Sequence, residues 1–281
     1  MTQISQIKKV KYTQFDANDY FRIHNSIRMK NKYSINLLFL FSIAIAFTSC
    51  RARFYTPNRN PIPLFKKSGD VYLDLSSNLT NKIDLTGGYA IAKGVGAYVG
   101  YSKAFQSTSN GDSASGSTYR YNGEMLNFGL GYFLNENIDQ SFRFEIYGDY
   151  AFGTFKNRVS GGNIQYFNGN FKRIGIMPNI GYSSLDNRFN MAYSLRLSNI
   201  SFSNASISDN AYWRSDIERY QSKGSYQMVE QAMMFRFGSE QAKFQIQLAS
   251  YHGLNADELV NAVPRWNASV MIGLVLTPQF R

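Results

Sequence analysis

The stretch Arg188 to Ser198, RFNMAYSLRLS, decides the fold class of this chain. Large apolar residues occupy the odd positions from Phe189 to Leu197, and smaller or polar residues occupy the even positions between them. Successive side chains of a β-strand point to opposite faces, so strict alternation over this length predicts a strand with one apolar face. A helix would instead repeat its apolar residues every three or four positions.

The same period of two recurs from Asp70 onward. We expect strands at residues 69–77, 82–92, 95–105, 118–134, 140–155, 170–184, 188–202, 224–238, 242–252 and 265–278. After the second run, short connections alternate with long ones, and the long ones span 106–117, 156–169, 203–223 and 253–264. Short turns at one end and long loops at the other are typical of transmembrane β-barrels. The sequence therefore predicts an all-β fold: an antiparallel, up-and-down transmembrane β-barrel of about ten strands (eight to twelve), preceded by a signal-peptide helix. Pro178, which lacks a backbone donor, predicts a β-bulge or a misplaced boundary in the sixth run.

Alternation alone does not say which face of a barrel is outside. The seven lysines of residues 68–281 lie at the ends of the expected strands, in turns or in loops, whereas a solvated strand surface would carry lysines along its length. Charges within the expected strands suit a packed polar lumen, where opposite charges can pair. These are Arg143, Glu145, Asp149, Arg196, Glu230 and Arg236. We expect such a barrel not to be an open pore. The alternative is a soluble, lipid-anchored periplasmic barrel that binds an apolar ligand.

The N-terminal region has the layout of a secretory signal peptide. Residues 29–32 are basic, residues 35–47 are largely apolar, and two small residues precede Cys50, the single cysteine of the chain. An apolar run of this length is too short for a membrane-crossing helix. We therefore expect residues 1–28 to be an over-extended, disordered start, 29–49 the signal peptide and 69–281 the barrel. Residues 50–68 are basic and hold three of the six prolines, which predicts an extended tether.

Residues 46–50, AFTSC, resemble a bacterial lipobox. The resemblance implies that Cys50 is the lipidated first residue of the mature protein, held in outer-membrane lipid by its acyl chains. The alternative is a buried free thiol at the end of a core helix. An even number of strands places both barrel ends on the periplasmic side, which agrees with an inner-leaflet anchor.

The charge distribution argues against nucleic-acid binding. The net charge is +11, but residues 1–67 hold 12 of the 30 Lys and Arg and only 2 of the 19 Asp and Glu. The expected barrel is therefore nearly neutral and has no basic stripe of the kind that binds nucleic acid. One cysteine and two histidines give no multi-cysteine metal site, and we expect neither metal nor cofactor.

Two segments, FYTPNRNPIPLFKKSGDVYLDL (residues 54–75) and NKIDLTGGYAIAKGVGAYVGYS (residues 81–102), resemble lipidated outer-membrane β-barrel proteins of the Bacteroidota, a Gram-negative group. In those proteins a Pro-Asn segment and a Pro-Leu-Phe stretch precede the first strand. The resemblance extends over about residues 29–281 and implies an outer-membrane location with a lipid anchor and termini facing the periplasm. It implies no activity, because a fold does not determine function.

The long connections carry the candidate binding residues. Tyr212, Trp213 and Arg214 lie in the connection 203–223 and could bind protein or glycan, because an exposed Trp beside Arg suits such surfaces. Alternatively, they fold the loop onto the barrel rim. Ser113, in Asp-Ser-Ala, resembles the acceptor of the short O-glycosylation sequon of the Bacteroidota. We therefore expect a structural or interaction role through the external loops.

An enzyme is the alternative from another class. Omptin proteases are ten-stranded outer-membrane barrels that use Asp and His at the outer rim, and this chain resembles them only in His252 at the outer end of an expected strand, near Asp257 and Glu258. A base with an orienting carboxylate is the minimum for hydrolysis. The alternative reading of His252 is a solvated residue at a loop edge, and we assign no catalytic residue.

The lipobox resemblance makes a direct prediction. Cells fed a fatty-acid analogue should label the wild-type protein and should not label Cys50→Ala, because the acyl chains need the thiol. Ser42→Ala, within the apolar run, keeps the lipobox and should label as the wild type does. Equal labelling of Cys50→Ala and wild type would contradict a lipid at Cys50.

Overall fold

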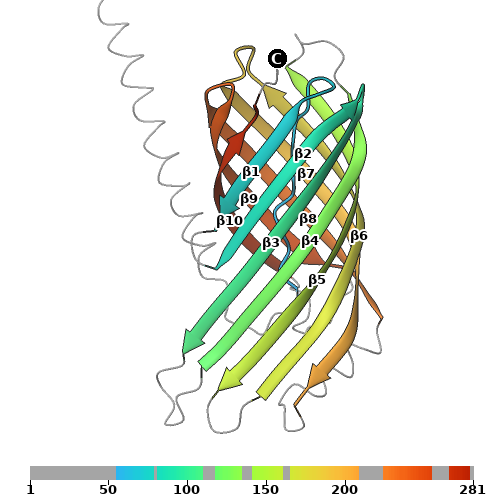
Figure 1. The fold of residues 1–281 in the computed structure, drawn as a ribbon, viewed down its shortest axis with the longest axis vertical. Coiled ribbons are helices and arrows are strands. Elements are labelled where there is room, and N and C mark those ends of the chain that lie inside the picture. Colours follow the sequence, from blue (N-terminus) through green and yellow to red (C-terminus); the bar gives the residue numbers. More distant parts are fainter. Residues whose placement is uncertain are drawn as a thin grey trace, which may run out of the picture. The chain divides into compact units, whose positions relative to one another are not determined.

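The alternating runs form ten strands that close into one antiparallel barrel, in which each strand pairs with its neighbours in sequence and β1 pairs with β10 (Figure 1). This computed structural model describes residues 55–78, 81–109, 118–134, 141–160, 165–208, 224–254 and 266–278, without the side chains of 108, 109, 266 and 267. No helix of the described residues is long and apolar enough to cross a membrane. The strands are β1 (Val71–Ser77), β2 (Lys82–Ala92), β3 (Val95–Ser109), β4 (Thr118–Leu134), β5 (Phe142–Ser160), β6 (Gln165–Ser183), β7 (Phe189–Ile207), β8 (Ser225–Gly238), β9 (Ala242–Gly253) and β10 (Trp266–Leu276).

The barrel has an apolar outer face, and its interior combines charged and polar residues with aromatic-rich clusters. In β7, Met191, Tyr193 and Leu197 are exposed, whereas Asn190 and Arg196, in the opposite phase, are buried. The outward residues of β4 from Leu126 to Leu134 are all large and apolar. At about 3.3 Å per residue and a tilt of about 40°, those residues rise roughly 20–25 Å, close to the apolar band of about 25 Å that outer-membrane barrels present to lipid. The alternation therefore predicted the strands correctly, and it marks the outer face.

Beyond this apolar band, toward the long connections, the outward residues become polar. In β5 they are Thr154, Lys156 and Arg158. Across β3 and β4, Lys103 and Glu124 pair in register and form an exposed ion pair of 3.0 Å. Strands β3 to β6 reach the lower end of the barrel in Figure 1, which is the end of the long connections.

Several predicted boundaries were therefore wrong. The connection expected at 156–169 is mostly strand, because β5 continues to Ser160 and β6 begins at Gln165. Lys103, Lys156 and Lys172 accordingly lie within strands rather than in loops or at strand ends. Where polar residues occupy both faces, the apolar period of two disappears, and the sequence pattern underestimates strand length.

Pro178 produces no bulge. Its neighbours pair with β7 in one unbroken register, with Ile176 opposite Leu197 and Asn179 opposite Ser194, and Pro178 itself lies opposite Ile146 of β5. The irregularity between β6 and β7 lies at Asn168 and Asn170 instead. The missing N–H removes a donor without changing the pairing.

Residues 55–66 run through the barrel interior, so the expected tether at 50–68 is not a free linker over the residues that are described. The segment has no regular secondary structure, and Tyr55 to Phe65 are buried except for half-buried Thr56. Tyr55 packs with Phe155 and Phe171 in the half nearer the long connections, while Phe65 packs with Phe133 in the half nearer the short turns. A turn at Ser68 and Gly69 (φ +87°) then reverses the chain into β1. We call residues 55–66 the plug segment.

The apolar band can be tested by introducing a lysine within the band and, separately, a lysine beyond it. Leu130, at the centre of the band on β4, is 62% exposed. Leu130→Lys should lower the free energy of unfolding in lipid vesicles by about 2–4 kcal/mol, since a lysine at the bilayer midplane is unfavourable. The matched control, Asn122→Lys, lies on the same face of β4 beyond the band and should change it by about 0–1 kcal/mol. Urea titration measures both, and equal effects would contradict membrane insertion at this band.

Candidate functional site

The backbone of the plug segment is buried without a helix or a sheet to satisfy its polar groups. Such groups require partners from elsewhere. The three prolines, Pro57, Pro61 and Pro63, remove three N–H donors from the segment. The prolines, which suggested an extended tether in the sequence, therefore lower the number of hydrogen bonds that the barrel wall must supply.

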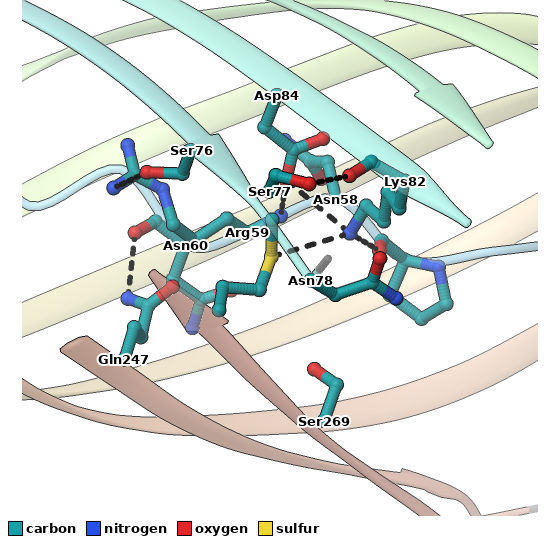
Figure 2. A network of polar contacts seen from close by, with 12 residues as sticks. Asn58, Arg59, Asn60, Ser76, Ser77, Asn78, Lys82, Asp84, Gln247 and Ser269 are labelled. Carbon is teal, nitrogen blue, oxygen red and sulfur yellow. Dashed lines mark hydrogen bonds and ion pairs between the residues drawn. The ribbon is translucent and has the colours of Figure 1, made fainter. Parts of the chain in front are cut away.

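Side chains of the barrel wall donate hydrogen bonds to six carbonyl groups of the plug. Arg143 donates to Leu64 O at 2.7 Å, and Arg236 donates to Ile62 O at 2.6 Å. Gln247 donates to Asn60 O at 3.1 Å, which Figure 2 shows from close by. Asn179, Arg196 and Lys82 donate to the carbonyls of Pro61, Asn58 and Pro57. In the opposite direction, the backbone N–H groups of Phe65 and Arg59 donate to Glu145 and Asp84, each at 2.8 Å.

Four charged residues form a fully buried network at the centre of the lumen. Arg173 of β6 donates to Asp149 of β5 from Nη2 at 2.6 Å and from Nε at 2.9 Å. Arg196 of β7 pairs with Glu230, which lies directly opposite it on β8. Longer contacts join the two pairs, with Arg173 at 3.8 Å from Glu230 and Arg196 at 3.9 Å from Asp149. The four charges balance, as burial requires.

The plug segment completes this network. Arg173 Nη1 donates to the Tyr55 hydroxyl at 2.5 Å and to Asn58 Oδ1 at 2.8 Å. On the opposite wall, Arg59 of the plug forms a buried ion pair with Asp74 of β1 and donates to Ser76 Oγ at 3.0 Å. Each arginine thus links the plug to the wall.

A further buried pair lies beside the plug on β2. Lys82 and Asp84 are 3.2 Å apart, and Asp84 also accepts the Arg59 N–H (Figure 2). Met271 Sδ on β10 is 3.8 Å from Lys82 Nζ. Charges from β1, β2, β5, β6, β7 and β8 therefore converge on one segment.

Two wall glycines make room for the plug. A Cβ at Gly181 would lie 2.5 Å from a methyl carbon of Leu64, and a Cβ at Gly96 would lie 2.8 Å from the Phe65 ring. Leu64 itself has a left-handed backbone (φ +58°), an unfavourable conformation for a leucine. Its burial and its carbonyl bond to Arg143 hold it there.

The structure places all six predicted lumen charges inside the barrel. Asp149, Arg196 and Glu230 meet in the central network, whereas Arg143, Glu145 and Arg236 lie nearer the short turns. Among the described residues, sequence reasoning missed six others: Arg59, Asp74, Lys82, Asp84, Arg173 and Lys243. Asp74 and Arg173 occupy inward phases of their strands, so the alternation could have identified them. Nothing in the pattern marked Arg59, because it lies in no strand.

The remaining predicted residues are not brought into this site. Cys50, Ser113, Tyr212, Trp213 and Arg214 lie outside the described residues, as do Asp257 and Glu258. His252 is exposed near the end of β9. Within the described ranges, no cluster of His, Cys, Asp and Glu could hold a metal ion.

Comparisons with known proteins find structural likeness only. The sequence matches no family model and no curated protein. The outer membrane protease OmpT from Escherichia coli aligns with 74% of this chain and 93% of its own at 10% identity and a TM-score of 0.48. The translocator domain of the autotransporter NalP from Neisseria meningitidis aligns with 91% of this chain and 98% of its own at 10% identity and a TM-score of 0.44. LpxR from Salmonella typhimurium aligns with 75% of this chain and 100% of its own at 7% identity and a TM-score of 0.33.

Replacing a carboxylate by an uncharged amide should change the free energy of unfolding much more in the central network than at the exposed surface. Asp149→Asn leaves Arg173 buried without its nearest carboxylate and should lower the free energy of unfolding by about 3–5 kcal/mol. Glu124→Gln removes the exposed pair with Lys103 and should change it by about 0–1 kcal/mol. Urea titration of the refolded protein compares them. A loss below about 1 kcal/mol for Asp149→Asn would show that the network is not what stabilises the lumen.

Proposed function

We propose that this protein is an outer-membrane β-barrel lipoprotein, that its plug segment closes the lumen, and that it acts through its external loops rather than by conduction or catalysis. The apolar outer band and the charged residues of the lumen support the membrane location, because lipid would contact the band and would not reach the lumen. The lipid at Cys50 and the link to the Bacteroidota rest on the sequence resemblances given above.

One observation carries the proposed closure: the lumen is already occupied by residues of the same chain. Tyr55, Arg59 and Ile62 are among the most completely buried side chains of the described residues. A ten-stranded barrel is only slightly wider than one that side chains alone can fill. An added extended chain with bonded carbonyls therefore leaves little room for a continuous water path.

The course of the plug also bears on the anchor. The ends of the barrel, Val71 and Leu276, lie on the short-turn side, which is periplasmic in barrels of this type. Going backward along the chain, the plug leads from this side to Tyr55 in the half nearer the long connections. The described chain therefore begins in the half opposite to the barrel ends, and Cys50 itself lies outside the described residues.

The soluble-barrel alternative does not fit. A soluble barrel that binds an apolar ligand needs a polar outside and an open apolar lumen, whereas this barrel exposes large apolar residues outside and its lumen holds the plug. The rim-hydrolase alternative rests on His252, and we do not propose it.

Closure can be tested by conductance in planar bilayers. The wild-type protein should show no steady conductance. Replacing residues 55–66 by a Gly-Ser linker of equal length removes Arg59 and the packed side chains and should give measurable channel openings. A stable large conductance of the wild type would contradict closure by the plug. Retained mobility shift on boiling after cold SDS identifies folded samples of both proteins, and the wild-type result decides even if the replacement does not fold.

A further inference from the structure

A cavity opens at the short-turn end of the lumen, where the plug turns into β1. Its volume is about 430 Å³. Plug residues 63–66, the turn that follows, and the lumen faces of β5, β8 and β9 contribute to its lining. Five cations line it, and only two carboxylates do. The cations are Lys66, Lys67, Arg143, Arg236 and Lys243, and the carboxylates are Asp70 and Glu240.

Three of these cations are buried without a carboxylate partner. Arg143 is 5% exposed, and Arg236 and Lys243 are each 3% exposed. No carboxylate of a described residue lies within ion-pair distance of any of the three. Elsewhere in the lumen, the buried cations do contact a carboxylate: Arg59, Lys82, Arg173 and Arg196 each have one within ion-pair distance.

Neutral acceptors do not compensate these charges. Arg143 Nη1 donates to Leu64 O, while its buried Nε has no partner among the described residues. Arg236 donates to Gln245, Ile62 O and Tyr72. Lys243 donates to the carbonyl of Glu240 at 3.0 Å. The hydrogen bonds orient the cations, and the positive charge remains.

The nearby acidic groups are turned to other partners. Asp70 accepts the backbone N–H groups of Lys66 at 2.7 Å and Lys67 at 3.1 Å, and Glu145 accepts the N–H of Phe65. The Glu240 side chain is exposed. Lys66 lies at the rim, where burial and the neighbouring Arg143 lower the pKa of its amine. Burial is the larger of these two causes, and the positive charge of Arg143 adds to it.

We propose that this cavity binds an oxyanion, a phosphate or carboxylate group, between Arg143, Arg236 and Lys243, with Lys66 at the rim. Buried charges in proteins are normally paired, and an anion here would supply the missing partner. Arginine and lysine are the usual donors to phosphate and carboxylate oxygens. The cavity volume suits the anionic group of a small molecule or the end of a longer one.

The test uses the full chain in non-ionic detergent at constant ionic strength. Isothermal titration with sodium phosphate and with sodium acetate, against sodium chloride, should show saturable binding of at least one oxyanion. Lys243→Gln should weaken it about tenfold, the effect of one lost charge-assisted contact. The matched control is Lys93→Gln, which removes an equal charge in the exposed turn between β2 and β3, outside the cavity lining, and should leave the affinity unchanged.

Lys243 is the first choice because Arg143 and Arg236 also hold plug carbonyls, so their loss would affect folding as well. Lys66→Gln is the second variant and should weaken binding in the same direction. If phosphate binds more tightly than acetate, the ligand is phosphorylated; if acetate binds more tightly, the ligand carries a carboxylate. No saturable binding at millimolar concentration, chloride competing equally, or equal weakening by Lys93→Gln would each overturn the proposal.

Discussion

The structure depends on one electrostatic constraint: a charge buried in a narrow lumen needs an opposite charge beside it. Arg173 and Arg196 satisfy it with Asp149 and Glu230, and Arg59 brings the same solution onto the plug by pairing with Asp74. Because Arg173 also binds Tyr55 and Asn58, wall and plug stabilise each other. Without the plug, those donors would face a cavity, and without the wall, the plug backbone would lose its hydrogen-bond partners.

The polar interior and the apolar exterior have one cause. A strand that faces lipid on its outer side needs polar residues on its inner side, because the plug backbone inside the barrel takes its hydrogen-bond partners from the wall. In β7 the same alternation serves both surfaces, with Tyr193 outside and Arg196 inside. Where the outward residues turn polar, as at Lys156, the barrel wall continues past the band that suits lipid.

How much of this the sequence could predict follows from its periodicity. Ten strands, antiparallel closure and the inward phase of Arg143 and Glu230 follow from an apolar period of two. Strand ends in the polar half do not, because Lys156 and Asn157 are polar on opposite faces and leave no alternation to follow. The sequence pattern could not predict that the plug segment is buried in the lumen, for another reason. Pro57 and Asn58 are typical of linkers, and Asn58 is held by partners more than 100 residues away in sequence, such as Arg173. Arg173 itself was missed although its phase was available.

Among the described residues, buried cations contact carboxylates at the centre of the lumen but not at its short-turn end. This difference suggests a structural role for the first group and a binding role for the second. At the centre each buried cation has its carboxylate, so the network is complete without a ligand. At the short-turn end, Arg143 and Arg236 hold the plug by its carbonyls and keep their charge. Stability alone would favour a carboxylate in direct contact with each arginine, as Asp74 provides for Arg59. Two buried arginines without a carboxylate of the described residues in ion-pair contact, beside an open cavity, are therefore better explained by an anion that comes and goes than by packing.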